Sequence, residues 1–383
     1  MKIKFALILA VINSALIAEC SDLDQAECNN WPTYCTWDNE NQICTEVGGG
    51  GGGNLDYGPY EFSYLTESDG IRNSPYYADG LVYFPTDAPP PYKSIIFTPG
   101  WGGGSTTMTG WAEYFASYGF IAMAIGPNDE MNDTHQMRAE GLLDAIETVI
   151  SEGERTNSPL FDSVDPDKFI VAGYSMGGGA SQVALVLDHP NVEESIVGAI
   201  ALNATILFED CNVCSGSEYC ICLVPEFLDH NMPTMIVAGQ NELQELPDYD
   251  GLLGQDIYSN TPETTTKILY EIANLGHSAA EASAGTVHEK MLQWMNYLLL
   301  EDTNYCDSLL VSPDDASQYL TTLECGSTLN FDLNNDSFIN QLDTYFLMGT
   351  IITVSNSGID LNYDGATDIF DLLHFIDYLN FGG

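Results

Sequence analysis

Residues 168–180 read KFIVAGYSMGGGA, and this stretch decides the fold of the chain. The apolar run over 168–172 predicts a buried strand, and the small residues from Gly177 onward open an apolar-periodic helix that continues to about Leu187. Ser175 then lies on the turn between them. A Gly-x-Ser-x-Gly turn holds its serine in a strained conformation with an exposed Oγ, and the glycines avoid clashes on both sides. The stretch therefore predicts a nucleophile elbow, which presents a serine for covalent chemistry.

Strands and helices alternate on both sides of this elbow. Apolar runs predict strands at 81–84, 94–98, 120–125, 197–202, 234–238 and 266–272. Helical periodicity is present at 111–118, 135–150 and 287–300. This alternation predicts an α/β fold with a doubly wound, mostly parallel sheet. Ligands of such sheets bind at the carboxyl ends of the strands, which is where Ser175 would emerge.

A serine nucleophile needs a base, and one of the six histidines is placed to supply it. His277 follows the strand that ends at Ile272, so its imidazole is predicted at the same edge of the sheet as Ser175. The other histidines have structural explanations or no pattern: His135 and His288 fall in helices, His189 precedes Pro190 in a loop, and His230 and His374 match no motif. His277 is therefore the predicted general base.

The chain order Ser, acid, His places the acid of a catalytic triad after the strand at 234–238. Glu242 lies at this point, and Glu245 and Asp248 follow in the same loop. We predict Glu242 as the acid. Glu245 and Asp248 stay as alternatives, because a chain with 56 acidic residues offers many nearby carboxylates.

An oxyanion hole needs two backbone N–H groups close to the nucleophile. Met176 supplies one because it follows Ser175, and the loop TPGWGGG at 98–104 supplies the other through Trp101. Trp101 and Tyr174 would also form aromatic walls that bind substrate, or else simply pack in the core.

The acidic balance of the chain excludes several classes of partner. Nine Lys and Arg residues stand against 56 Asp and Glu, which gives a net charge of −47. Nucleic acid and anionic membranes would repel such a surface, so neither is an expected partner. A solvated surface suited to salty water explains this charge better than binding to a polycation does.

The first residues have the form of a secretory signal. Two lysines precede the apolar run 5–18, which is too short to span a bilayer. Residues 1–18 are therefore predicted to be a signal peptide, no transmembrane segment is expected, and the protein would be secreted to the extracellular space. Cys20 raises the alternative of a lipidated protein, but Glu19 before it is not the small residue of such sites.

Cysteines mark a small module before the catalytic domain. Ten cysteines behind a signal peptide indicate disulfides in an oxidising compartment. Residues 19–47 hold four of them and predict a disulfide-stapled module, either an adhesive surface or a stable cap, which the glycine-rich linker 48–55 separates from a catalytic domain at 56–325. Disulfides are also favoured over zinc for Cys211, Cys214, Cys220 and Cys222, and Cys306 and Cys325 are predicted to close the end of the catalytic domain.

Residues 326–383 carry two copies of a calcium-loop pattern and no Lys or Arg. Oxygen-bearing side chains stand at offsets 1, 3, 5, 9 and 12 of each loop, the arrangement that encloses one calcium ion. The predicted ligands are Asp332, Asn334, Asp336, Asn340 and Asp343 in the first loop, and Asp360, Asn362, Asp364, Asp368 and Asp371 in the second. An apolar helix follows each loop, at 344–348 and 372–379, so we predict an α-helical domain with structural calcium. The chemistry of Ser175 needs no cofactor.

Short motifs spread over the catalytic region form a recognisable set: GPY at 58–60, YFPT at 83–86, PGW at 99–101, YGF at 118–120, GYSMGGG at 173–179, MPT at 232–234, GHS at 276–278, WM at 294–295 and Cys306. With these motifs the region resembles the bacterial polyester hydrolases of the cutinase and poly(ethylene terephthalate) (PET) hydrolase group, secreted serine esterases of the α/β-hydrolase fold. The resemblance implies Ser175 as nucleophile, His277 as base, and Trp101 and Met176 as oxyanion donors.

Several positions depart from that family. Glu242 stands where the family has aspartate, and its longer side chain demands a backbone shift. Tyr174 replaces a tryptophan or histidine, and Trp101 replaces a tyrosine or phenylalanine. The family tryptophan that stacks on aromatic rings after the sixth strand has no counterpart, since residues 203–206 read NATI. The missing ring weakens the case for aromatic polyesters but not for ester hydrolysis itself.

The two calcium loops resemble a dockerin, a calcium-dependent module whose family binds cohesin domains, although Ser337 stands where the first loop usually has glycine. The chain is thus predicted to be a secreted, calcium-binding serine ester hydrolase that cleaves polyesters and has a cohesin-like protein as a further partner. One alternative is a lipase or a carbohydrate or acetyl esterase with the same triad. Another is a scaffold-bound adhesion protein with a non-catalytic hydrolase domain, against which the intact Ser175 and His277 count.

Overall fold

A computed structural model describes the protein over residues 57–189, 192–207, 228–247, 249, 251–325 and 340–353. It also describes residues 35–38, 43–46, 333, 369–370, 372–373 and 375–376. The chain divides into two compact units, Met1–Glu324 and Cys325–Gly383. Within the described ranges, no helix combines the length and the apolar character that crossing a membrane requires.

Several predicted features lie outside the described residues. They are the signal 1–18, most of the module 19–47, the linker 48–55, Asp248, the group Cys211, Cys214, Cys220 and Cys222, and eight of the ten predicted calcium ligands. The module contributes one described hairpin, in which β1 (Cys35–Asp38) pairs antiparallel with β2 (Ile43–Glu46). Cys306 and Cys325 are both disulfide-bonded.

The first unit is built on a mixed sheet, whose described strands follow the order β13-β12-β10-β8-β7-β5-β6-β4-β3. The central strands run parallel and are β6 (Ile121–Gly126), β5 (Tyr92–Thr98), β7 (Val164–Tyr174), β8 (Ile196–Leu202), β10 (Thr234–Gly239) and β12 (Lys267–Ile272). The edges are antiparallel and consist of β3 (Phe62–Leu65) and β4 (Asp79–Pro85) on one side and β13 (Ala316–Thr321) on the other. A separate antiparallel pair is formed by β9 (Ile206–Leu207) and β11 (Gly251–Leu252).

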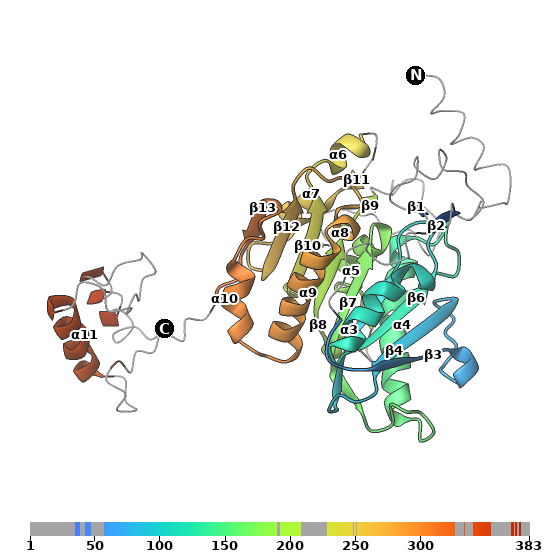
Figure 1. The fold of residues 1–383 in the computed structure, drawn as a ribbon, viewed down its shortest axis with the longest axis horizontal. Coiled ribbons are helices and arrows are strands. Elements are labelled where there is room, and N and C mark those ends of the chain that lie inside the picture. The colour runs from blue at the N-terminus through green and yellow to red at the C-terminus, as the bar shows by residue number, and fades with distance from the viewer. Residues whose placement is uncertain are drawn as a thin grey trace. The chain divides into compact units, whose positions relative to one another are not determined.

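The described helices of this unit are α3 (Thr109–Ser117), α4 (His135–Glu154), α5 (Met176–Ala184), α6 (Glu242–Glu245), α7 (Gly254–Asn260), α8 (Ala279–Ala282), α9 (Ala284–Leu299) and α10 (Asn304–Leu310). Helices cover both faces of the sheet (Figure 1). Adjacent residues of β5 point to opposite faces, so Phe97 packs against Phe115 of α3 while Ile96 joins the cluster under α4. On the α3 face, His288 of α9 stacks on Trp111 with 3.8 Å between ring centres.

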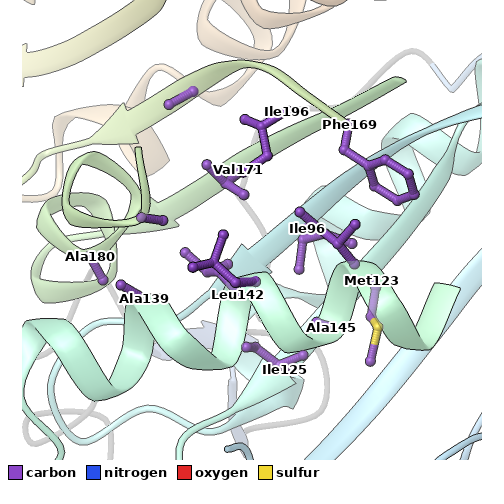
Figure 2. Close-up of a cluster of buried hydrophobic side chains, with 14 of the residues drawn as sticks. Ile96, Met123, Ile125, Ala139, Leu142, Ala145, Phe169, Val171, Ala180 and Ile196 are labelled. Carbon is purple, nitrogen blue, oxygen red and sulfur yellow. The ribbon is translucent and has the colours of Figure 1, made fainter. Parts of the chain in front are cut away.

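The main apolar cluster fills the space between the sheet and α4 (Figure 2). Leu142 and Ala145 of α4 lie over Ile96, Met123 and Val171, which come from three adjacent strands, and all five side chains are buried. Burial of apolar surface stabilises the folded state by about 25 cal/mol per Å². The core therefore makes a rigid platform of β7, the strand that ends at the predicted elbow.

The predicted strands and helices of the catalytic region all form, and an α/β fold results as expected. The edge strands β3 and β13 and the short helices α7 and α10 are additions that the apolar pattern did not predict. β13 reads ASQYLT, and most of its residues are half-buried or exposed, so it lacks the continuous apolar run of a central strand.

The second unit is described mainly by α11 (Gln341–Thr353). Leu347 of this helix is fully buried and forms a small cluster with Leu372 and Phe375. The predicted helix at 344–348 is therefore part of a longer one.

Candidate active site

Ser175 lies on the turn between β7 and α5, at the carboxyl end of β7. Its backbone has φ 53° and ψ −117°, a sparsely populated conformation of a kind that costs on the order of 1–3 kcal/mol. The turn is tight against β5, because a Cβ on Gly177 would lie only 2.3 Å from the Thr98 carbonyl oxygen. Three backbone hydrogen bonds hold the strained serine: its N–H donates to the Leu202 carbonyl at 2.8 Å, and its own carbonyl accepts the N–H groups of Thr205 at 3.0 Å and Gly179 at 3.1 Å.

The structure brings Ser175, His277 and Glu242 together from three separate loops. The Oγ of Ser175 lies 2.8 Å from Nε2 of His277, and Nδ1 of the same ring lies 3.1 Å from Oε1 of Glu242. The loops follow the parallel strands β7, β12 and β10, whose carboxyl ends share one edge of the sheet. A hydroxyl, an imidazole and a carboxylate in this order allow a proton to pass from serine to histidine while the acid holds the ring tautomer.

The three candidates for the acid are placed differently. Glu242 is the first residue of α6, and its side chain is 0% exposed where it meets the imidazole. Glu245 is exposed, and its carboxylate accepts the backbone N–H of His277 at 2.8 Å. Asp248 lies outside the described residues. Of the two described candidates, Glu242 is the one in contact with the ring.

Asn203, which no sequence pattern singled out, contacts this acid. It is completely buried directly after β8, and its Nδ2 donates to Oε1 of Glu242 at 2.7 Å. An asparagine at the end of an apolar strand is an ordinary turn residue by sequence, so no local signal announces the contact.

Tyr174, predicted as an aromatic wall of the site, contacts the loop of His277. Its hydroxyl donates to the carbonyl oxygen of His277 at 2.8 Å, and the two ring centres are 5.7 Å apart. The residue before Ser175 therefore holds the loop that carries His277.

Both predicted oxyanion donors lie on segments that adjoin Ser175. Met176 is the first residue of α5, where backbone N–H groups have no acceptor within their own helix. The loop after β5 approaches so closely that a Cβ on Gly100 would lie 3.0 Å from the Cβ of Ser175. Trp101 follows in that loop with 62% of its surface exposed, and its Nε1 donates to the carbonyl of Met131 at 2.9 Å.

A buried arginine that the sequence did not single out supports this loop. The guanidinium of Arg138 donates to the carbonyls of Pro99 at 3.1 Å, Gly100 at 3.4 Å and Glu130 at 2.8 Å. Burial lowers the pKa of Arg138, and nearby Asp133 and other acidic groups oppose that shift. The arginine joins the oxyanion loop to the loop before α4.

Two further ionisable groups next to the site have shifted pKa values. His135 lies behind the elbow with its Nε2 2.8 Å from the Thr205 carbonyl, and burial lowers its pKa to about 4. Burial also raises the pKa of the Glu281 carboxyl, while nearby His277 acts in the opposite direction. Neither side chain belongs to the series of contacts that runs from Ser175 through His277 to Glu242.

Two of the predicted calcium ligands, Asn340 and Asp343, are among the described residues. The Oδ2 of Asp343 accepts the backbone N–H of Asn340 at 2.9 Å, and Oδ1 of Asn340 accepts that of Leu342 at 2.8 Å. Both residues stand at the start of α11, and Asp343 is buried. No group of three or more His, Cys, Asp or Glu side chains in the described segments is arranged to hold a metal ion.

The amino-acid sequence is similar to one family model and to several cutinases. Residues 56–214 match the family model described as PETase, PET hydrolase-like. Cutinase est1 of Thermobifida alba is 24% identical over 252 residues, which cover 64% of this chain and 75% of the relative. Cutinase 1 of Thermobifida cellulosilytica is 22% identical over 260 residues, which cover 66% of this chain and 86% of the relative. The family segment includes Ser175, Trp101 and Met176 and ends before Glu242 and His277.

Proposed function

We propose that the chain, whose residues 56–214 match the PET hydrolase-like family model and which is similar to cutinases, is a serine ester hydrolase that cleaves polyesters through an acyl-enzyme. The observation that carries the proposal is the chain of contacts from Ser175 through His277 to Glu242, with 2.8 Å and 3.1 Å between successive heavy atoms. A serine hydroxyl alone is a weak nucleophile, and an imidazole within hydrogen-bond distance activates it.

Acylation uses every group of the proposed site. Oγ of Ser175 attacks the ester carbonyl carbon while Nε2 of His277 takes the hydroxyl proton. The Nδ1–H of the ring donates to Glu242, whose charge stabilises the imidazolium. The tetrahedral oxyanion accepts the backbone N–H groups of Met176 and Trp101. The intermediate then expels the alcohol, which takes the proton from Nε2 and leaves the serine acylated.

Deacylation repeats these steps with water. Nε2 of His277 removes a proton from a water molecule, whose oxygen attacks the acyl carbon. The second tetrahedral intermediate collapses, Ser175 regains its proton, and the carboxylic acid leaves. Since both halves use the same base and the same oxyanion donors, loss of any one group slows both.

The exposed surface beside the nucleophile supports a polymer as the substrate. Trp101 and Met131 expose 62% and 51% of their surfaces, and the indole donates to the Met131 carbonyl. An exposed apolar surface suits a long chain, because such a substrate binds without entering an enclosed cavity. The segment 203–206 contains no aromatic ring, so we propose that aliphatic polyesters are cleaved faster than aromatic ones.

Product release from aliphatic and aromatic polyester films, measured side by side, tests the proposal. The wild type should release soluble products, and Ser175→Ala should reduce release by at least about 10³-fold. Ser312→Ala is a matched control, since Ser312 is exposed and belongs to no part of the proposed site.

Every other outcome shows which part of the proposal is wrong: the nucleophile, the polymer substrate or the enzymatic function. Equal release by Ser175→Ala and the wild type would show that Ser175 is not the nucleophile. Cleavage of short soluble esters without release from either film would keep the triad and replace the polymer by lipid or acetylated glycan esters. A wild type that neither cleaves esters nor reacts with a serine-directed phosphonate would instead support a non-catalytic adhesion protein.

We further propose that residues 326–383 form a dockerin-like domain, held by structural calcium, that binds a cohesin-like protein. The repeated loop pattern supports this, and Asn340 and Asp343 fit it, because amide and carboxylate oxygens are the ligands that calcium prefers. Calcium would supply cross-links between loop and helix. Chelation should lower the melting temperature of this unit and leave the phosphonate labelling rate of Ser175 unchanged. The apolar leader 1–18 supports secretion.

A further inference from the structure

Asn203 is held in place by its backbone, and its side chain is buried. The residue directly follows β8, which neighbours β10 in the sheet (Figure 1). Its φ of 44° is in the left-handed region, which asparagine tolerates better than most residues. Its backbone N–H donates to the Val237 carbonyl on β10 at 2.7 Å, and its side chain is fully buried.

Both ends of the Asn203 amide contact the loops of the triad. Nδ2 donates to Oε1 of Glu242 at 2.7 Å and to the Gly276 carbonyl at 3.3 Å, and Oδ1 accepts the N–H of Ala280 at 2.8 Å. Because only the amide oxygen can accept from Ala280, the amide nitrogen must face Glu242. Gly276 and Ala280 lie on either side of His277 in sequence, so one side chain connects the acid to both flanks of the base.

Glu242 depends on this support. Its carboxylate is completely buried, and Oε1 accepts from both Asn203 and His277. Oε2 has no hydrogen-bond partner among the residues that the structure describes. A buried charge is costly without hydrogen bonds, and hydrogen bonds to a charged group are stronger than neutral ones. Glutamate also has one more rotatable bond than aspartate, so its carboxylate needs more contacts to stay in one place.

We propose that Asn203 is a positioning residue of the triad, which holds the charged carboxylate of Glu242 against the imidazole and ties its loop to that of His277. This inference rests on the ester hydrolase function proposed above. Since Asn203 is buried and acts through Glu242, its loss should lower kcat and leave KM nearly unchanged.

Two substitutions separate the hydrogen bond from the backbone conformation. Asn203→Gly removes the amide at a φ that glycine adopts freely, and kcat should fall by about 10- to 100-fold with KM within about threefold of the wild-type value. Asn203→Asp keeps the size and the acceptor for Ala280, but it places a carboxyl oxygen where the amide nitrogen met Glu242.

The aspartate variant gives a readout that a purely structural role would not change. The ionisable groups around the site are Glu242 and Glu245 from α6, and His277 and Glu281 from the segment after β12. Two buried carboxyl groups within hydrogen-bond distance share one proton, and the protonated group donates to the other. Asn203→Asp should therefore keep more of the wild-type kcat than Asn203→Gly does, and it should lose this advantage as the pH rises and the shared proton leaves. Asn203→Gly has no such proton, so its kcat relative to the wild type should not fall with pH in this way.

Asn274 provides the matched control. It also has a positive φ, 61°, and it is exposed in the same loop as His277. Asn274→Gly and Asn274→Asp should keep kcat within about twofold of the wild type. All rates are divided by the concentration of active sites, which phosphonate titration counts, so that a partly unfolded variant is not mistaken for a slow one.

Three results would overturn the inference. Wild-type kcat per active site in Asn203→Gly would show that the amide does not hold the acid. A ratio of kcat in Asn203→Asp to kcat in Asn203→Gly that does not fall as the pH rises would show that residue 203 has no electrostatic contact with Glu242. Equal losses in the Asn274 variants would mean a general effect of the loop. A wild type without phosphonate labelling or ester turnover would instead refute the proposed function itself.

Discussion

His277 is the residue at which the contacts of the site converge. Its ring nitrogens face Ser175 and Glu242, its backbone N–H donates to Glu245, and its carbonyl accepts from Tyr174. A histidine held at both ring nitrogens and at its backbone is already oriented before a substrate arrives, so little entropy is lost in reaching the transition state. Such a site should respond strongly to small displacements of any of these groups.

The first prediction concerns the length of the acid. Glu242→Asp withdraws the carboxylate by about one bond from both Asn203 and His277, and a displacement of about 1 Å costs up to about 100-fold in rate. We therefore expect kcat to fall by about 10- to 100-fold. Glu242→Gln keeps the length of the side chain but loses its charge. In this variant kcat should fall further, by about 10³- to 10⁴-fold. Steady-state kinetics on a soluble ester measures both.

Glu245→Gln is the matched control for these variants, because it makes the same change three residues later in α6. It retains an acceptor for the His277 N–H, so kcat should stay within about threefold of the wild type. A large loss in Glu245→Gln together with wild-type rates in Glu242→Gln would reverse the assignment of the acid.

At the scale of elements, the site is a set of loops at the carboxyl ends of β5, β7, β8, β10 and β12. These strands are adjacent in the sheet, and the loops are joined by side chains that cross from one to the next. Asn203 links the loops after β8, β10 and β12, and Arg138 of α4 links the loop after β5 to the loop before α4. The position of the loop that carries Trp101, a predicted oxyanion donor, therefore depends on a helix that supplies none of the predicted catalytic groups.

The second prediction tests that helix contact. Arg138→Lys keeps a positive charge but loses the planar fork that reaches several carbonyls at once, and we expect stability to fall by about 1–3 kcal/mol. The kcat should also fall about tenfold, because the loop that carries Trp101 loses its anchor at Pro99. Denaturant unfolding and soluble-ester kinetics measure the two effects.

Arg72→Lys is the comparison for this variant, since the described partners of the Arg72 guanidinium are Asp144 and Glu147 of α4. Arg72→Lys should lower stability and leave kcat unchanged. A wild-type kcat in folded Arg138→Lys would show that the arginine is structural and does not shape the site.

The third prediction is the pH dependence of stability through His135. Burial lowers its pKa to about 4 in the folded protein from an ordinary value of 6.5. Above pH 6.5 the ring is neutral in both states, and as the pH falls toward 4 only the unfolded chain binds the proton. Stability is therefore full above pH 6.5 and is lost toward pH 4, by about 1.4 kcal/mol per pH unit.

Urea unfolding across this pH range measures the slope. His135→Gln should flatten it by about one proton. Equal slopes in His135→Gln and the wild type would show that His135 does not remain neutral in the folded state.

At the scale of the whole molecule, charge is the dominant feature. Nine basic side chains can pair with only a minority of 56 acidic ones, so most of the net charge of −47 is left to repel itself. Self-repulsion destabilises a compact state and is weakened by screening. The acidic surface thus makes stability depend on ionic strength.

The fourth prediction follows from this repulsion. Raising NaCl from about 0.1 M to about 1 M shortens the Debye length from about 10 Å to about 3 Å, so the melting temperature should rise and ester hydrolysis should persist at the higher salt. Solutes that are excluded from the protein surface also stabilise proteins, without screening charge. An uncharged osmolyte at the same osmolality as the NaCl therefore serves as the control. A melting temperature that falls steadily with NaCl would contradict the prediction.

The sequence by itself determined the central strands and the long helices, and it pointed to Ser175 and His277. The elbow at Ser175, the histidine after β12 and the alternation of strands and helices are local signals, because backbone geometry and apolar periodicity are set by residues close together in the chain. The tertiary structure decided the rest. It brought Glu242 rather than Glu245 to the imidazole, and it placed Asn203 on that acid and Arg138 on the oxyanion loop. These contacts join residues 35 to 39 positions apart, and only the docking of neighbouring strands and helices brings such residues within hydrogen-bond distance.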